Sequence, residues 1–499
     1  MDVAELRRLL AASPAEPFVR TMARLAEEDP DFVSIVCEGD SITRREFERR
    51  SNRLARAYAG RGAGFGDYVA IALPNGIEFY LAFFAALKIG AVPLPLSYRL
   101  PVVERQAIID LAKAALLVGV VEGEHPGYPA LPAGFEPDAS VSDEPLPEVV
   151  SPAWKAPTSG GSTGRPKIIR AGSGAEGSPA INRLLYRYTP EDVQAVVAPL
   201  YHNSALGMSV GGLLLGQRLV VAKKFDAEDV LRLIGEHGVT WLMLVPTMMH
   251  RMYRLIEAGG RYDLSSIRVL LHLAAKCPEW LKEQWLELLG PEKVLEIYGG
   301  TESISITLIT GEEWLAHRGS VGRPWIGDMK VLDPDGEELP PGEVGEIYMK
   351  GADGMGPSYS YVGAEARTID GWQTLGDLGW QDEDGYLYIS DRRVDMIVSG
   401  GANIYPAEVE NAIDQHPAVL SSVVVGLPDD DLGQRAHAIV QAEPGTTVRE
   451  VLDFLAGRLV RYKIPRSVEF TDQPLRDDSG KVRRGKVRDA AIERMKTRA

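Results

Sequence analysis

The chain has 499 residues and a formal net charge of −16, with 45% hydrophobic and 25% charged residues. This length exceeds what one hydrophobic core usually organises, so we expect at least two domains. The acidic balance argues against nucleic-acid binding, which needs a basic face, and requires any site for an anionic nucleotide to be locally positive. The 2 cysteines are too few for a disulfide framework or a zinc site.

Neither an integral membrane segment nor a secretory signal is predicted. No apolar run is long enough to span a bilayer. The N-terminus has no basic region followed by an apolar run. We therefore expect a reduced, cytoplasmic location.

Strands and helices alternate through the first part of the chain. A helical pattern over 43–61 is followed by a strand over 69–73, a helix over 78–89 and an extended segment over 91–95. This alternation predicts a parallel or mixed α/β sheet. It continues with strands over 193–199, 218–222, 241–245, 267–271 and 294–298, and with helices over 207–215, 227–237, from 247 and over 279–289.

The pattern changes from about Gly319. Turn signals such as Asp333-Pro-Asp-Gly336 separate short strands and predict a β-rich subdomain. After Arg392 the chain returns to mixed α/β, with a helix over 406–414 and a strand over 421–426. We therefore predict a large domain over 1–391 and a small one over 392–499, of roughly a hundred residues.

The segment 158–167 reads Thr-Ser-Gly-Gly-Ser-Thr-Gly-Arg-Pro-Lys. Backbone amides, hydroxyls and the Lys167 ammonium in such a loop can hold a polyphosphate. It is not a P-loop, because Pro166 removes a backbone donor where that motif begins its helix. A flexible Ser/Gly linker is the alternative, but a linker rarely runs on into apolar residues such as Ile168 and Ile169.

Further motifs follow in order, and together with the loop they resemble the adenylate-forming superfamily of acyl-CoA synthetases, nonribosomal-peptide adenylation domains and luciferases. The likeness covers nearly the whole chain, and its texture is closest to fatty-acid, bile-acid and steroid-acid CoA ligases and related amide-forming ligases. The motifs are Tyr298-Gly-Gly-Thr-Glu302, Thr374-Leu-Gly-Asp-Leu-Gly379, Asp391-Arg-Arg-Val-Asp395 running into 399–410, and Gly480-Lys481.

The resemblance implies an α/β fold in two parts. The large N-terminal domain would hold two packed sheets flanked by helices, plus a distorted β-barrel. A small, mobile α+β C-terminal domain would carry the catalytic lysine.

The resemblance also implies a reaction. A carboxylic acid and ATP would form an acyl-adenylate with loss of pyrophosphate, and CoA would then displace AMP. ATP, Mg²⁺ and CoA are thus expected, with a medium-chain, aryl or bulky polycyclic acid as the substrate. The alternative is an amide-forming ligase that passes the acyl group to an amine. A carrier-protein loading domain and a kinase that makes ADP are less favoured, and the oligomeric state is left open.

By the same resemblance, Thr301 would contact the α-phosphate and Glu302 would bind Mg²⁺. Lys481 would bridge the carboxylate and the α-phosphate, which suits a compact ammonium. The alternatives are a helix-start carboxylate for Glu302 and a solvated basic tail for Lys481. The β- and γ-phosphates would be held by Thr158, Ser159, Gly160, Ser162, Thr163 and Lys167.

Other residues are implied in binding the rest of the substrates. Asp377 would accept the ribose hydroxyls, with a turn residue as the alternative. Arg392 would contact ribose or phosphate, with a surface salt bridge as the alternative. His202 would gate the acid pocket or orient the carboxylate, with a buried histidine satisfied by backbone as the alternative. Ala274, Ala275 and Tyr298 would contact the nucleotide, and Gly400 and Gly401 would line the pantetheine channel.

Some positions depart from the family pattern. Val394 stands where the hinge usually has Asp or Lys. Lys276 stands where the adenine segment usually has Pro, and it is expected to reach solvent, with a phosphate contact as the alternative. Glycines over 207–216 leave one helix with few side chains, and we expect the space to admit a bulky acid. The acid pocket is expected to be walled by 201–203, Gly207, Met248, 272–274 and 298–300.

Overall fold

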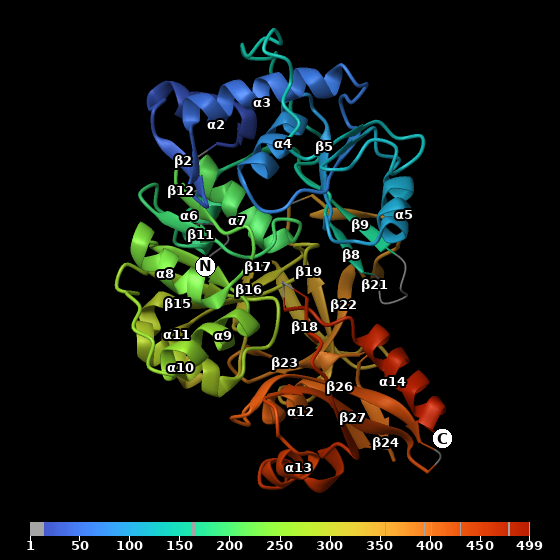
Figure 1. The fold of residues 1–499 in the computed structure, drawn as a ribbon. Coiled ribbons are helices and arrows are strands. Elements are labelled where there is room, and N and C mark those ends of the chain that lie inside the picture. Colours follow the sequence, from blue (N-terminus) through green and yellow to red (C-terminus); the bar gives the residue numbers. More distant parts are fainter. Residues whose placement is uncertain are drawn as a thin grey trace.

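The computed structural model describes residues 14–160, 166–354, 356–393, 395–400, 402–429, 431–477 and 480–498. A large domain of several sheets is followed by a smaller C-terminal domain (Figure 1). Four residues named from the sequence lie outside the described residues: Ser162, Thr163, Val394 and Gly401.

The first sheet is parallel throughout, in the order β5-β4-β6-β7. Helix α3 (Arg44–Ala59) begins where the Thr43 side chain accepts a bond from the Glu46 amide. Buried aromatic side chains of α4 (Ile77–Lys88), among them Phe79 and Phe83, fill the core beside this sheet. The other elements are β4 (Tyr68–Ile71), β5 (Val92–Pro95), β6 (Leu116–Val118), β7 (Ala130–Leu131), α2 (Phe18–Glu28) and α5 (Val102–Ala112), and the short pair β1 (Glu16–Pro17) and β10 (Glu176–Gly177).

The second sheet has 9 strands, with a parallel centre and antiparallel edges. The mixed α/β sheet predicted from the sequence is thereby confirmed. Across the sheet the strands are β17 (Arg323–Ile326), β16 (Ile306–Thr310), β15 (Val294–Tyr298), β14 (Val269–His272), β13 (Trp241–Leu244), β11 (Val193–Val196), β12 (Arg218–Val221), β2 (Val33–Cys37) and β3 (Asp40–Thr43).

Helices cover this second sheet and bury the fully enclosed rings of Trp241, Trp285 and Trp314. The Asp226 side chain accepts bonds from two amides at the start of α8, and Gly238, with φ +60°, closes that helix. The helices are α6 (Pro179–Leu185), α7 (Asn203–Leu214), α8 (Ala227–His237), α9 (Pro246–Glu257), α10 (Glu279–Leu289) and α11 (Gly311–Ala316), with a short η1 (Pro291–Lys293).

Two small antiparallel sheets form the β-rich part of the large domain. One runs β18-β19-β22-β21 with β23 paired to β22, and the other runs β20-β9-β8. Strands β18 to β23 follow β17 and confirm the predicted β-rich subdomain, whereas β8 and β9 join β20 from earlier in the chain. The strands are β8 (Thr158–Gly160), β9 (Pro166–Ala171), β18 (Asp328–Leu332), β19 (Gly345–Lys350), β20 (Tyr359–Val362), β21 (Arg367–Ile369), β22 (Trp372–Gln381) and β23 (Leu387–Arg392).

The C-terminal domain is built on the sheet β25-β24-β27-β26, with β28 paired to β27. It buries its own core, which includes Ile404, Val409 and Leu455. Its elements are β24 (Ile397–Ser399), β25 (Ala402–Ile404), α12 (Pro406–Ile413), β26 (Val419–Asp429), β27 (Gly433–Ala442), α13 (Val448–Ala456), η2 (Arg461–Lys463), β28 (Ser467–Phe470) and α14 (Arg484–Arg498).

Within the described ranges, no helix has both the length and the apolar character needed to cross a membrane.

Candidate active site

Lys167, Glu302 and Tyr361 meet at the end of the glycine-rich loop. The Lys167 Nζ atom lies 3.2 Å from Glu302 Oε1 and donates to the Tyr361 hydroxyl at 2.9 Å. That hydroxyl donates in turn to Glu302 Oε1 at 2.6 Å, and the Lys167 ammonium lies 4.0 Å from the Tyr361 ring centroid. A buried carboxylate is thus held between a cation and a phenol.

The backbone around Glu302 fixes where its carboxylate points. The Ser358 hydroxyl donates to the Glu302 carbonyl at 2.8 Å. A Cβ at Gly300 would lie 2.4 Å from Leu375 Cδ1 and 2.8 Å from Glu302 Oε2, so a side chain there would displace both groups. Ser303 has φ +51°, a costly conformation for this residue type. Strain of this kind at a chain reversal is typical of functional sites.

Tyr361 was not predicted from the sequence as a site residue. It reaches the site because β20 pairs with β9 in antiparallel register, with Tyr361 opposite Ile169. Burial and the hydrogen bond to Glu302 raise the pKa of its phenol, which keeps it a donor. The alternating Tyr359-Ser-Tyr361 pattern was the available signal, but it does not reveal the partner strand.

Asp377 is a buried carboxylate inside strand β22, so the turn alternative for it is wrong. Its Oδ2 accepts from the Tyr298 hydroxyl at 2.8 Å, and its Oδ1 lies 3.2 Å from Arg392 Nε. Arg392 stands opposite it in β23 and is exposed. The Asp377 carboxylate therefore has partners on two different strands, Tyr298 on β15 and Arg392 on β23.

Lys481 faces the large domain from the C-terminal domain. The surrounding protein lowers the pKa of its ammonium mainly by displacing water, Arg392 lowers it further, and Asp477 and Glu302 oppose this. The residue keeps a solvent-exposed part, and its backbone amide donates to Asp477 Oδ1 at 3.0 Å. The charge of Lys481 therefore interacts with the charges of Glu302 and Arg392.

The position of Lys481 depends on Gly480. This glycine has φ +76°, and a Cβ there would lie 2.4 Å from Thr247 Oγ1 on α9. Two ion pairs strengthen the contact between domains, since Glu104 on α5 lies 3.1 Å from Arg483 and 2.8 Å from Lys486. The chain is therefore in an orientation that brings Lys481 to the cleft.

His202 precedes α7 and stacks at a tilt on Tyr201, with ring centroids 4.5 Å apart. Burial, together with the charge of Lys481, lowers the pKa of His202 to about 4, so the imidazole is neutral at physiological pH. Its Nε2 atom is buried without a partner among the described residues. The alternative of a histidine satisfied by backbone does not hold for this nitrogen.

The segment expected to contact adenine follows strand β14. Ala274 and Ala275 are exposed, and Ala274 has the strained φ of +74°. Lys276 does not point to solvent, because its Nζ donates to the Ile389 carbonyl at 3.1 Å. His272 does not wall an open pocket either, since it is fully buried, 3.6 Å from Glu296.

The glycines of α7 do not leave empty space. A Cβ at Gly207 would contact Trp154 at 3.5 Å and Lys155 Nζ at 3.9 Å, and one at Gly211 would lie 2.8 Å from Asn182. Neighbouring side chains fill the space beside these glycines. The expectation of room for a bulky acid is therefore wrong. A small hollow, with room for about one water molecule, lies on another face of the helix, lined by Ala205, Met208, Met243, Gln194 and 195–198.

The glycine-rich loop and the channel glycines lie in different places. Thr158, Ser159 and Gly160 form β8, which pairs with β9 so that Ser159 stands opposite Lys167. Gly400 turns between β24 and β25, and its amide donates to the Leu432 carbonyl of the same domain. Figure 1 draws β24 at the lower right of the C-terminal domain, away from β22. Gly400 is thus not gathered with the other residues.

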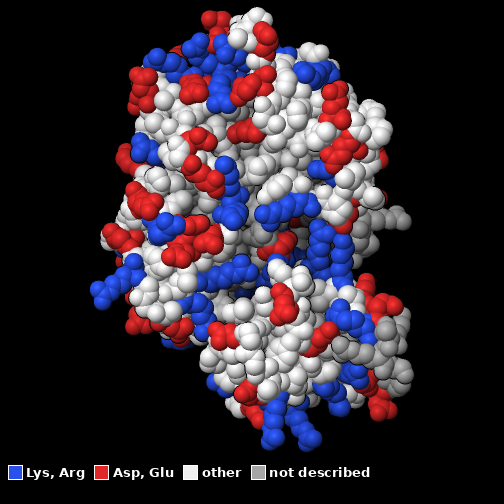
Figure 2. Space-filling view, viewed as in Figure 1, with Lys and Arg blue, Asp and Glu red and all other residues white. Residues whose placement is uncertain are grey.

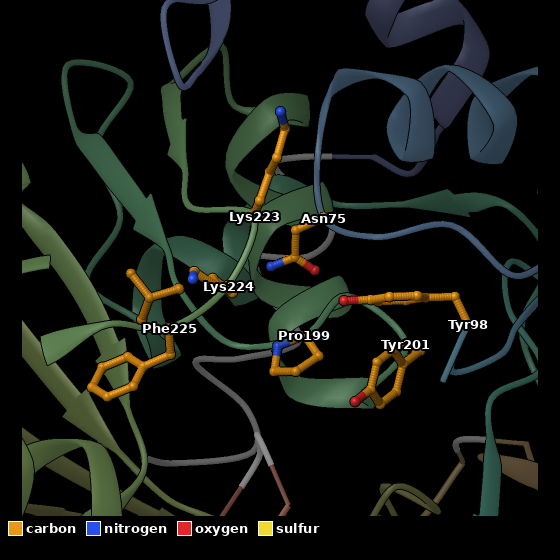
Figure 3. Close-up of a pocket in the computed structure, with 8 residues that line it drawn as sticks. Asn75, Tyr98, Pro199, Tyr201, Lys223, Lys224 and Phe225 are labelled. Atoms are coloured by element: carbon orange, nitrogen blue, oxygen red, sulfur yellow. The ribbon is translucent and has the colours of Figure 1, made fainter. Parts of the chain in front are cut away.

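The surface agrees with a locally positive cleft in an acidic protein. Figure 2 shows Lys and Arg side chains gathered along the groove between the two domains. A further small hollow opens beside the His202 turn, where Asn75 donates to the Ala198 carbonyl at 3.0 Å (Figure 3). Its lining residues are Asn75, Tyr98, Val197, Pro199, Tyr201, Lys223, Lys224 and Phe225.

Comparison with known proteins identifies the family. Residues 22–359 match the model of the AMP-binding enzyme family, and residues 408–481 match that of the AMP-binding enzyme C-terminal domain. The chain belongs to the AMP-binding enzyme family. It is an acid–CoA ligase of the adenylate-forming type, and its substrates are ATP with Mg²⁺, a small-molecule acid and CoA.

Relatives and solved structures cover nearly the whole chain. A feruloyl-CoA synthase of an Amycolatopsis species is 36% identical, over 93% of this chain and 97% of its own length. A fatty acid–[acyl-carrier-protein] ligase of Streptomyces coeruleorubidus is 32% identical, over 95% and 96%. The o-succinylbenzoate–CoA synthetase of Bacillus subtilis, solved with its acyl-adenylate, superposes with a TM-score of 0.82 at 28% identity, over 95% and 99%. The same synthetase bound to ATP and a magnesium ion gives a TM-score of 0.79.

Proposed function

We propose that this cleft joins the carboxylate of an aryl acid to the α-phosphorus of ATP, and that the acyl group then passes to CoA. The observation that carries the proposal is the convergence of Lys167, Glu302, Asp377 and Lys481 on one cleft, drawn from both domains. Two anions must be held together for this reaction, so positive charge has to offset their repulsion.

Glu302 and Lys167 serve the phosphates in this proposal. A single buried carboxylate is a fitting Mg²⁺ ligand, because Mg²⁺ is usually held by one or two carboxylates together with substrate phosphates. When bound, Mg²⁺ supplies charge neutralisation at the phosphate oxygens. Lys167 exchanges its bond to Glu302 for a phosphate oxygen, and Tyr361 keeps the carboxylate oriented meanwhile.

Asp377 accepts the ribose hydroxyls, and Arg392 contacts ribose or phosphate. Asp377 is suited to this role because Tyr298 and Arg392 already fix its two oxygens in place. Thr301 and the exposed Ala274 and Ala275 complete the nucleotide side of the cleft. In this proposal the neutral His202 contacts the acid. An uncharged imidazole suits that role because it can donate to a carboxylate or accept from a thiol.

Lys481 bridges the carboxylate and the α-phosphate during adenylation. We further propose that the domain boundary at 391/392 is a hinge, and that rotation about it withdraws Lys481 and brings Gly400 to the cleft for the second step. Asp391 supports a defined pivot, because its Oδ2 accepts from the Ala407 amide of α12 at 2.9 Å.

An aryl acid is favoured over a bulky polycyclic one by the filled glycine face of α7. The names of the feruloyl-CoA synthase and the o-succinylbenzoate–CoA synthetase also refer to aryl acids.

The test is a pyrophosphate-release screen over benzoic, cinnamic, fatty and polycyclic acids, with products identified by mass spectrometry. We expect AMP, pyrophosphate and an acyl-CoA with an aryl acid. Formation of an amide with an amine, without formation of a thioester with CoA, would contradict CoA as the acceptor. Formation of ADP would contradict adenylation. Turnover of polycyclic acids alone would contradict an aryl acid as the substrate.

A further inference from the structure

Lys155 is a buried cation beside α7 that the proposed chemistry does not use. It is 7% exposed and lies shortly before the glycine-rich loop. Its Nζ donates to Asn203 Oδ1 and lies 4.0 Å from the Trp154 ring centroid. Among the described residues, no carboxylate lies within ion-pair distance of it. A buried charge without a counter-charge is costly, and proteins seldom keep one without a use for it.

The ammonium has donors left over. It carries three N–H bonds, of which Asn203 takes one, while the ring of Trp154 offers only its face. Burial alone lowers the pKa of Lys155 to about 7, so near neutral pH the group is available both charged and uncharged.

Its neighbours connect Lys155 with the reaction centre. Asn203 opens α7 and directly follows His202, whose Nε2 is buried without a described partner and whose pKa responds to Lys481. Across α7 the ammonium faces Gly207, where a Cβ would lie 3.9 Å away. Gly207 therefore places no side chain against the ammonium.

We propose that Lys155 and Asn203 form a recognition point for an oxygen acceptor on the acid substrate, remote from its reacting carboxyl. This inference rests on the proposed function. The acceptor is a hydroxyl, alkoxy or carbonyl oxygen or a second carboxylate, and an anion gains most because it also neutralises the buried charge. Lys155 is thus a specificity-determining residue, outside the bond-making step.

The test compares matched acids: cinnamic acid, 4-hydroxycinnamic acid and 4-carboxycinnamic acid. Pyrophosphate release gives kcat/KM for each acid with the wild type, Lys155→Met and the exposed control Lys350→Met. We expect the wild type to favour the oxygenated acids by about tenfold or more, as for sites built to bind a substrate oxygen. Lys155→Met should lose that preference and keep cinnamic acid within about threefold of wild type, while Lys350→Met keeps it.

The proposal is overturned if Lys155→Met slows all three acids by the same factor, or if the wild type shows no preference. If Lys155→Met does not fold, Lys155→Gln replaces it and should keep part of the hydroxyl preference while losing the carboxylate preference. If Lys155→Gln lost the hydroxyl and the carboxylate preference equally, that result would also count against the proposal. Failure of the wild type with every acid tested would instead refute the proposed function.

Discussion

Replacing Gly480 by alanine tests how the two domains meet. The new Cβ would lie 2.4 Å from Thr247 Oγ1 and 3.3 Å from Val245 Cγ2. The positive φ of +76° adds a backbone cost of about 1–2 kcal/mol for a non-glycine residue. That backbone cost belongs to the loop in any domain orientation, whereas the collision with Thr247 exists only in the orientation described here.

The collision sets the expected effect on adenylation. Overpacking of this kind costs about 1–3 kcal/mol, which corresponds to a rate loss of about 5- to 150-fold. Acyl transfer from a supplied acyl-adenylate should stay within about twofold of the wild type, because that step does not need the contact. Stopped-flow pyrophosphate release measures the first step, and acyl-CoA formation measures the second.

Two further variants isolate the cause. Gly433 has φ +73° and no atom within 4 Å of the position that a Cβ would take, so Gly433→Ala carries the backbone cost alone and should leave adenylation near wild type. Thr247→Ala should restore much of the adenylation rate to Gly480→Ala. Equal slowing of both half-reactions, or no rescue by Thr247→Ala, would refute the reasoning.

Other perturbations have distinct signatures. Lys481→Ala should lower adenylation by about several hundredfold and spare acyl transfer, and equal loss of both would contradict its role. Asp377→Ala should raise the KM for ATP by about 10- to 100-fold with the KM for the acid unchanged in initial-rate assays. Tyr361→Phe should raise the Mg²⁺ concentration for half-maximal rate by about tenfold, and an unchanged Mg²⁺ curve would remove its positioning role. The pKa of Lys155 is about 7 in the fold, below its unfolded value of about 10.4. The cost of burying the charged ammonium therefore falls as the pH rises from 7 to 10. Urea titrations should show the free energy of unfolding of the wild type increasing over this pH range relative to that of Lys155→Met.

The motifs predicted the main polar residues of the site because each sits on a short local segment. Lys167, Glu302, Asp377 and Lys481 were all named from sequence, and Arg392 was placed opposite its partner only once β22 and β23 were seen to pair. Local turn chemistry favoured a loop position for Asp377, but strand pairing overrode it.

Residues brought in by distant pairing could not be predicted in the same way. Tyr361 bonds to a lysine 194 residues earlier, through a strand register that no local pattern specifies. The glycines of α7 suggest open space in the sequence, although Lys155 and Asn182 occupy it. Sequence shows that a side chain is missing at such positions, but only the fold shows what fills the gap.

The central claim is that a carboxylate oxygen of the acid bonds to the α-phosphorus of ATP in the cleft between the domains. It is tested most directly with an acid labelled with ¹⁸O in its carboxylate, converted to thioester by the wild-type enzyme. The account predicts AMP carrying one ¹⁸O atom and unlabelled pyrophosphate. Label in pyrophosphate or inorganic phosphate, with none in AMP, would contradict it.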